Sequence, residues 1–208
     1  MIAPIVLPRA FYNRRATLVA RDLLGAILVH PFAGQRLSGR IVETEAYTGH
    51  DDLASHGRQK RTPRNFPMWG DPGHAYVYLI YGRYWLLNVV CEPAGHPAAV
   101  LIRAVEPLDG EDVMAANRAG RPRREWTSGP GRLALALDIT GEHNSLDLTR
   151  TESGLWIEAG EPVPDGVVCT GPRIGMGPRV LEPWFSMPWR WWVGGNPYVS
   201  RKGLATCK

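Results

Sequence analysis

The sequence lacks any long uninterrupted apolar run. The most apolar region of its 208 residues, Tyr76–Cys91, is broken by Arg83 and Asn88, whereas a membrane-spanning helix needs about 18 consecutive apolar residues. No charged region precedes the short apolar run at the N-terminus, so we do not expect a secretory signal. We therefore expect a cytoplasmic protein with no membrane partner.

Cysteine and lysine are both scarce. The three cysteines, Cys91, Cys169 and Cys207, are far apart and show no CxxC spacing, so we expect reduced thiols and neither a disulfide nor structural zinc. Only three of the 24 basic residues are lysines, and none has a sequence context that would desolvate its amine. The composition therefore disfavours a nucleophilic lysine.

Glycine and proline, in contrast, are abundant at 23 and 18 residues, which excludes an all-helical bundle. The length fits one domain over residues 1–208, and we expect residues 1–12 to be loosely ordered. Apolar periodicity predicts a helix that Asn13 caps and Gly25 ends. The predicted strands cover 26–30, 39–47, 75–80, 84–90, 98–105 and 155–159, the predicted helices cover 109–120 and 129–139, and the segments 173–178, 183–193 and 195–201 are predicted loops. This pattern favours an α/β (α+β) fold with a mainly antiparallel sheet.

The formal charge is +4, and arginine supplies nearly all of the basic residues. Two runs, Arg58–Arg64 and Arg118–Arg124, each hold four cations and no acid. A single run of this kind is as often solvated surface as a binding site, but two in one basic chain favour a polyanionic partner. The turn from Gly129 to Gly131, ahead of a predicted helix, could also present backbone N–H groups to a phosphate.

The strand predicted at 39–47 carries two carboxylates. A period of two places Ile41, Glu43, Glu45 and Tyr47 on one face. That face is either a solvent-exposed edge or a site with acid–base chemistry, and the residue pattern alone leaves both open.

Arg103 interrupts a segment, 98–105, that is otherwise apolar. A buried guanidinium needs hydrogen-bond partners. Two roles remain open: a structural ion pair, or the orientation of a carboxylate or carbonyl within a site.

A β-hairpin is predicted around Tyr81, Gly82 and Arg83. If these residues form the loop, Tyr76 pairs with Asn88 and shares a face with Tyr78. A slip of one residue would move Asn88 to the opposite face. An aromatic residue at the hairpin tip has little core to join, so Tyr81 is the strongest candidate for a binding role.

The segment 50–56 offers ligands for a divalent metal in His50, Asp51, Asp52 and His56. No HExxH, P-loop or GxSxG motif accompanies them. We therefore expect neither a metal nor a cofactor, and retain a metal-dependent nuclease only as an alternative.

Several ordered blocks resemble the alkyladenine (3-methyladenine, or N-methylpurine) DNA glycosylase family. They extend over nearly the whole chain: LVARDLLGAILVH (18–30), GRIVETEAY (39–47), ASHGR (54–58), RTPRN (61–65), PGHAYVYLIYG (72–82), LIRAVEPLDG (101–110), SGPGRLALAL (128–137) and GNPYVSR (195–201). The resemblance implies one domain with a curved antiparallel sheet, flanked by helices, and a hairpin that protrudes into DNA. Two departures are an insertion at Gln59–Lys60 and Arg83 at the hairpin tip.

The resemblance implies a monofunctional enzyme that flips a damaged purine from double-stranded DNA and hydrolyses its N-glycosidic bond with water. Glu45 would be the general base, held near Arg103. The implied base-pocket residues are Tyr47, His56, Tyr78, Asn88 and Ile174, joined by Tyr76 from the predicted hairpin face. Tyr81 would fill the gap in the duplex, and the expected phosphate contacts are Arg61, Arg64, Arg83, Gly129 and Gly131. We expect a monomer, associated with the nucleoid if the source is bacterial; the other alternative is a non-catalytic lesion-binding or RNA-binding module.

Overall fold

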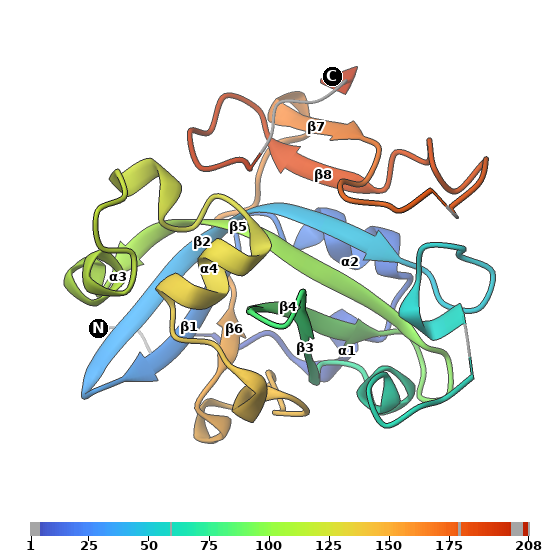
Figure 1. The fold of residues 1–208 in the computed structure, drawn as a ribbon, viewed down its shortest axis with the longest axis horizontal. Coiled ribbons are helices and arrows are strands. Elements are labelled where there is room, and N and C mark those ends of the chain that lie inside the picture. Colours follow the sequence, from blue (N-terminus) through green and yellow to red (C-terminus); the bar gives the residue numbers. More distant parts are fainter. Residues whose placement is uncertain (1–4, 59, 179, 201–205, 208) are drawn as a thin grey trace.

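Two long strands, β2 (Gln35–Tyr47) and β5 (Ala98–Asp109), run antiparallel through the middle of the molecule (Figure 1). The computed structural model describes residues 5–58, 60–178, 180–200 and 206–207. In these residues the fold is mixed α/β with an antiparallel sheet, which confirms the predicted class. No helix among them is long and apolar enough to span a bilayer.

The sheet continues on both sides of this central pair in the order β3-β4-β5-β2-β8-β7-β9. One end of β2 pairs instead with β1, which pairs in turn with β6. The bounds of these strands are β1 (Ile27–Phe32), β3 (Ala75–Ile80), β4 (Tyr84–Cys91), β6 (Trp156–Glu158), β7 (Val168–Gly171), β8 (Arg190–Val193) and β9 (Thr206–Cys207).

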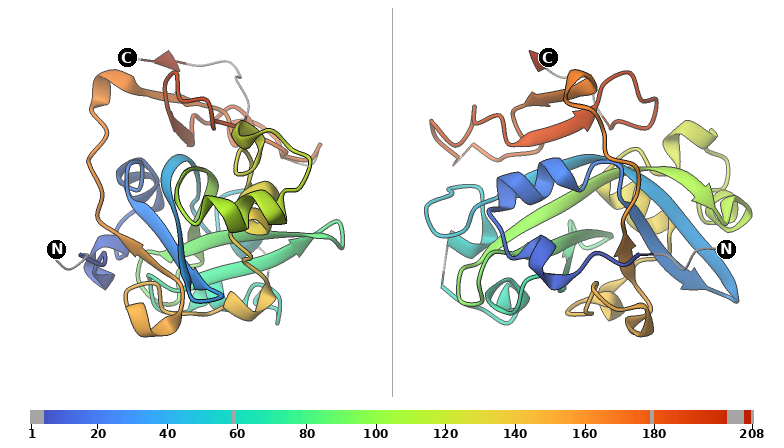
Figure 2. Two further views of the ribbon diagram at one scale, coloured as in Figure 1. Left: turned by 90° about the vertical axis from the view of Figure 1, so that its left-hand side faces the viewer. Right: turned by 180° about the vertical axis from the view of Figure 1, so that it is seen from behind.

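Short helices cover both sides of the central strands. Figure 1 shows α4 (Pro130–Ala136) in front of β2 and β5 and α2 (Ala16–Asp22) behind them, and the view from behind in Figure 2 reverses that order. Each helix turns an apolar face inward, and both faces contribute to the main buried cluster. The other helices are α1 (Arg9–Tyr12) and α3 (Glu111–Asn117).

A bulge in β2 changes which side chains share a face of this strand. Ile41 and Ala46 both belong to the main buried cluster, which a regular period of two would not allow. The pairing with β5 is irregular on each side of Glu43, and such a bulge turns the side chains that follow it. The expectation that Ile41 shares the face of the carboxylates is therefore wrong. Glu43 and Glu45 are themselves fully buried, which excludes the solvent-exposed edge.

The hairpin of β3 and β4 has the predicted register, with Tyr76 opposite Asn88 and Tyr78 opposite Leu86. Its turn begins at Tyr81, which has a φ of +52° and is 85% exposed. A non-glycine residue in the left-handed region is uncommon and costs conformational energy. The fold therefore projects a large aromatic side chain from the tip of this hairpin.

Some predicted boundaries are wrong. The helix expected from Asn13 begins at Ala16, and Asn13 does not cap it. Strand β5 continues through Pro107, which pairs opposite Gly39 next to a register shift; proline is tolerated at such an irregularity because the ladder hydrogen bond is already lost there. At the N-terminus, the residues from Arg9 to Tyr12 are helical and Tyr12 is fully buried.

The C-terminal part holds strands where loops were predicted. The segment 183–193 contains β8, and the antiparallel pairing of β7 with β9 sets Cys169 opposite Cys207. These two residues form a disulfide across a sequence separation of 38. The expectation of reduced thiols is therefore wrong for this pair, because the sheet brings together cysteines that sequence spacing alone shows as unrelated. Cys91 is free and buried.

Candidate active site

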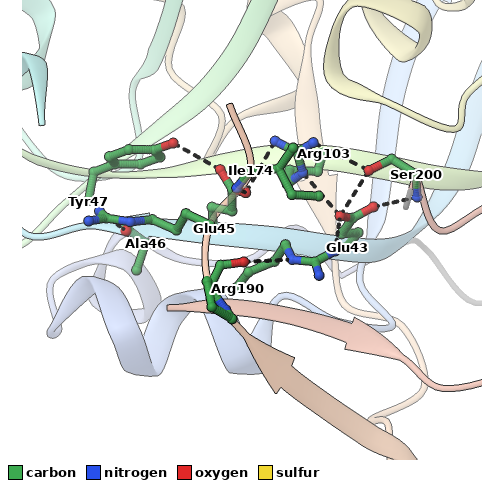
Figure 3. Close-up of polar contacts among 10 residues, drawn as sticks. Glu43, Glu45, Ala46, Tyr47, Arg103, Ile174, Arg190 and Ser200 are labelled. Atoms are coloured by element: carbon green, nitrogen blue, oxygen red, sulfur yellow. Dashed lines mark hydrogen bonds and ion pairs between the residues drawn. The ribbon is translucent and has the colours of Figure 1, made fainter. Parts of the chain in front are cut away.

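Glu45 lies fully buried on β2 and is held by three donors (Figure 3). Its Oε1 accepts the backbone N–H of Ile174 at 2.7 Å and lies 3.2 Å from Nη1 of Arg103. Its Oε2 accepts the hydroxyl of Tyr47 at 2.8 Å. A carboxylate has about four acceptor sites, so the described residues leave Oε2 able to accept one further donor, such as a water molecule.

Glu43 is bound by a different set of groups. Its Oε1 lies 3.0 Å from Nε of Arg103, 3.1 Å from Nη1 of Arg190 and 3.0 Å from the hydroxyl of Ser200. Its Oε2 accepts the backbone N–H of Ser200 at 2.7 Å. Two guanidinium groups and a backbone amide thus hold this carboxylate, which joins β2 to β8 and to the segment at Ser200.

Arg103 connects the two carboxylates. It projects from β5 with only 6% exposure. Burial opposes its charge, but Glu45 and Glu43 more than offset this and raise the pKa of Arg103 above its ordinary value. Of the two roles left open by the sequence, the geometry supports both, since Arg103 is a structural ion-pair partner of Glu43 and also orients Glu45.

A second buried ion pair positions the backbone that reaches Glu45. Arg173 contacts Asp52 through both terminal nitrogens, at 2.5 and 2.9 Å, and Nη1 also donates to the carbonyl of Ala46 at 3.0 Å. Both side chains of this pair are fully buried. Because Ile174 follows Arg173 directly, the pair fixes the N–H that binds Glu45.

A cavity of about 300 Å³ lies beside Tyr47. The rings of Tyr76 and Tyr78 are stacked there with centroids 5.1 Å apart, and the His56 ring meets Tyr78 edge-on at 4.7 Å. Asn88 is buried and donates to the carbonyl of Tyr76 at 3.0 Å. The described lining residues are Tyr47, Leu53, Ala54, His56, Arg64, Met68, Tyr76, Tyr78, Ile80, Asn88, Ala99, Gly175, Met176, Gly177 and Val180. Three tyrosines and a histidine thus form the aromatic part of the wall.

Two tyrosines and the histidine of this wall are held neutral, namely Tyr47, Tyr78 and His56. Burial and the charge of Glu45 raise the pKa of Tyr78 to about 12 and that of Tyr47 well above its usual value. Loss of hydration, with a further contribution from the cation of Arg64, lowers the pKa of His56. The Tyr47 hydroxyl therefore stays protonated and donates a hydrogen bond to Glu45.

A second cavity, of about 540 Å³, shares Tyr47 and Tyr78 with the first. The three residues that contact Glu45 line this second cavity; they are Tyr47, Arg103 and Ile174. Tyr81 at the hairpin tip and the turn at Gly129 and Gly131 also line it. Three further cations face it: Arg118, Arg121 and Arg132.

One cation of the second cavity, Arg118, has a donor left without a partner among the described residues. Burial, together with repulsion from Arg132 and Arg121, lowers the pKa of Arg118. The Nε of Arg118 is buried and has no hydrogen-bond partner among the described residues. Such an arrangement favours an anion, and a phosphodiester is the anion that guanidinium groups bind best in a bidentate manner.

Two comparisons relate this chain to known proteins. Residues 10–197 match the model of the family described as methylpurine-DNA glycosylase (MPG). The chain belongs to the methylpurine-DNA glycosylase family. It is accordingly a DNA glycosylase, a hydrolase of N-glycosyl bonds that acts on damaged bases in DNA.

Curated relatives of the glycosylase share nearly half of its sequence. One from Methanocella arvoryzae is 47% identical over 95% of this chain and 96% of its own length. One from Burkholderia cenocepacia is 46% identical over 94% and 91%, and one from Anaeromyxobacter dehalogenans strain 2CP-C is 49% identical over 94% and 86%. Each carries the name "Putative 3-methyladenine DNA glycosylase".

The predicted DNA contacts of the glycosylase lie in different places. Tyr81, Gly129 and Gly131 line the second cavity. Arg61 instead lies over the exposed ring of Phe66, with Cζ 4.2 Å from the centroid, and Arg83 lies 5.0 Å over the ring of Tyr84 next to the hairpin tip; neither lines either cavity. Gln59 of the insertion lies outside the described residues.

The four side chains proposed as metal ligands do not converge. Asp52 is engaged by Arg173, and the ring of His50 packs against Trp69, with centroids 5.1 Å apart. His56 shares a hydrogen bond with the hydroxyl of Tyr76 instead. Across the described ranges no three His, Cys, Asp or Glu side chains are grouped as metal ligands. The geometry gives no support to the nuclease alternative.

Sequence reasoning missed several residues that bind Glu43, position the backbone at Ile174 or line the second cavity. Arg190 and Ser200 bind Glu43 from 147 and 157 residues away, and no local pattern connects them. Arg173 carried a usable signal, since it directly precedes the predicted backbone contact at Ile174. Arg132 carried another, because it lies directly after the Gly129–Gly131 turn.

Proposed function

We propose that the glycosylase flips an alkylated or deaminated purine out of duplex DNA and hydrolyses its N-glycosidic bond with a water that Glu45 activates. The observation that carries this proposal is the environment of Glu45. Its Oε1 is fixed by Ile174 and Arg103, and its Oε2 is contacted only by Tyr47 among the described residues. All three partners line a cavity that adjoins the aromatic pocket.

The proposed step balances as follows. The water oxygen forms a bond to C1′ of the sugar, its proton passes to Oε2 of Glu45, and the electrons of the C1′–N9 bond leave with the purine. An abasic site remains. A lesion weakens base pairing, so a damaged base costs less to extrude than an intact one. The names of the relatives make 3-methyladenine the first substrate to test.

The pocket residues have distinct proposed roles. Tyr47, His56, Tyr76 and Tyr78 form the aromatic wall against which the flipped base stacks. Asn88, at the position set by the hairpin register, crowds the exocyclic amine that distinguishes guanine from hypoxanthine. Tyr81 enters the minor groove and occupies the space of the extruded nucleotide.

The test is release of free purine from methylated duplex DNA in the presence of EDTA, by the wild type and by Glu45→Gln. We expect the wild type to release purine and leave unbroken strands with abasic sites. Borohydride should trap no covalent adduct, because water and not an amine is the nucleophile. Tight binding without release would favour the lesion-binding alternative, and EDTA-sensitive strand cleavage would favour the nuclease.

A further inference from the structure

The aromatic pocket has one charged side chain among its described lining residues. Arg64 lies against Tyr78, with Cζ 5.5 Å from the ring centroid, and its Nη2 donates to the carbonyl of Leu79 at 3.0 Å. The adjacent Asn65 is buried and donates to the carbonyl of His56 at 2.9 Å. Arg64 is itself exposed to solvent, and these contacts place its guanidinium against the Tyr78 ring of the pocket wall.

The remaining polar groups of the pocket carry no charge. The pKa values of Tyr76 and Tyr78 are raised, chiefly by burial, and both phenols keep their protons. The pKa of His56 is lowered, so its imidazole is neutral at pH 7. Asn88 has no titratable group. A purine bound here would therefore have Arg64 as the one charged group among the described lining residues. The charges of Glu45 and Arg103, which also act on Tyr78, are the same in every Arg64 variant.

We propose that Arg64 favours lesions whose purine is neutral, such as hypoxanthine, over purines made cationic by alkylation at N3 or N7. The inference rests on the proposed function, because it concerns the charge on the base as it leaves. It sharpens that function to a substrate class within the same pocket.

The direction of the effect follows from the charge of the departing base. When the C1′–N9 bond breaks, a neutral purine becomes anionic and then takes a proton from solvent, whereas a cationic purine becomes neutral. A fixed cation stabilises developing negative charge, so it lowers the barrier for the neutral lesion relative to free enzyme and DNA. For the cationic lesion the same guanidinium repels the bound base and does not stabilise the neutral product, so it brings no comparable benefit.

Arg64 has two other conceivable roles, and each predicts a different pattern. A phosphate contact would serve every DNA substrate equally. A structural role through the carbonyl of Leu79 would lower stability and reduce activity on all lesions together. Selectivity between lesions of different charge is the property that only the proposed role changes.

The experiment is a competition in one tube between a hypoxanthine-containing duplex and a 7-methylguanine-containing duplex. It reports the ratio of the two kcat/KM values, from which the concentration of active enzyme cancels. Arg64→Gln and Arg64→Leu remove the charge, and the leucine keeps apolar contact with Tyr78. Arg64→Lys keeps the charge. Arg58→Gln is the matched control, because Arg58 is an exposed cation of the same segment that does not line the pocket.

We expect both charge-free variants to lower the hypoxanthine to 7-methylguanine ratio by about fivefold, the size of an effect from one partly screened charge. Arg64→Lys and Arg58→Gln should leave the ratio within about twofold of the wild type. An unchanged ratio in whichever charge-free variant folds, or an equal loss on both lesions, would overturn the proposal. If the wild type released neither base, the proposed function itself would fail, which is a distinguishable result.

Discussion

The surroundings of Glu43 and Glu45 differ although both carboxylates are fully buried, lie two residues apart on β2 and contact Arg103. Glu43 receives four contacts from Arg103, Arg190 and Ser200. Glu45 receives three contacts, and each comes from a residue that lines the second cavity. Neither Arg190 nor Ser200 lines that cavity.

This difference separates two uses of a buried carboxylate. A carboxylate that is shared by two buried cations and tied to distant segments holds the chain together, and removing its charge takes that shared anion away from both cations. A carboxylate whose partners all line a cavity, and which can accept a further hydrogen bond, is placed to accept a proton. Because Arg103 contacts both carboxylates, we propose that the Glu43 cluster supports the position of Glu45.

Glu45→Gln carries the largest expected effect. An amide keeps the shape of the side chain but cannot take the proton of the water, so excision should fall by about 10²- to 10⁴-fold. Lesion binding should stay within about tenfold, a change of at most about 1.4 kcal/mol. Single-turnover release of hypoxanthine and a binding titration measure the two quantities. Retained excision would remove Glu45 from the chemical step.

Glu43→Gln should act on stability. It leaves Arg103 and Arg190 facing each other without their shared anion, at a cost of about 3–5 kcal/mol. For a chain of this size that lowers Tm by roughly 10 °C. Thermal unfolding followed by circular dichroism measures the shift, with the exposed pair Arg150 and Glu152 as the control, because Glu152→Gln should change Tm very little. An unchanged Tm in Glu43→Gln would contradict the support role.

Tyr81→Ser tests whether excision at Glu45 depends on Tyr81 occupying the space that the flipped nucleotide leaves in the duplex. The side chain is 85% exposed, so its loss should cost little stability. Capture of a lesion in paired duplex should weaken by about tenfold, because an inserted aromatic ring recovers part of the few kcal/mol of lost stacking. A lesion in a single strand or bulge should be affected much less. Equal losses on both substrates with a lowered Tm would instead indicate packing.

The hydrogen-bond network of His30 and His143 gives a smaller, pH-dependent effect on stability. Their Nε2 atoms lie 3.0 Å apart, His143 Nδ1 accepts the N–H of Thr140, and His30 Nδ1 contacts the carbonyl of Leu137. All of these contacts are satisfied when both rings are neutral. Burial and the neighbouring His30 lower the pKa of His143.

The sign of this effect follows from the lowered pKa. The unfolded chain binds the proton more readily, so the contribution to stability is present above about pH 6.5 and is lost as the pH falls below it. Tm should therefore drop by a few degrees between pH 7.5 and pH 5.5, and by less in His143→Gln, which cannot titrate there. An equal drop in the two proteins would assign the effect to other groups.

The sequence was sufficient for features set by local pattern. Period-two alternation and the turn at Gly82 predict the β3–β4 hairpin, and its register places Tyr76 opposite Asn88 as expected. An arginine within the apolar strand β5 predicts buried polar partners, and Arg103 contacts two buried carboxylates. In each case the need for the feature can be read from the local pattern, although the partners of Arg103 come from another strand.

The features that escaped prediction depend on long-range pairing. The bulge at Glu43 arises from how β2 meets β5, and nothing in the β2 sequence alone marks it. The disulfide between Cys169 and Cys207 requires β7 and β9 to be neighbours. Strand β8 directly follows a proline-rich segment that favours a loop, and although its own tryptophan and valine residues suit a strand, only the pairing with both β2 and β7 gives them strand partners.

The most direct test of the division between the two carboxylates is a side-by-side measurement of single-turnover excision by Glu45→Gln and Glu43→Gln. Enzyme should be saturating, and the temperature should be one at which circular dichroism shows both variants folded. We predict that Glu45→Gln loses at least about 10²-fold while Glu43→Gln stays within about tenfold of the wild type. A nearly inactive Glu43→Gln beside an active Glu45→Gln would contradict the account.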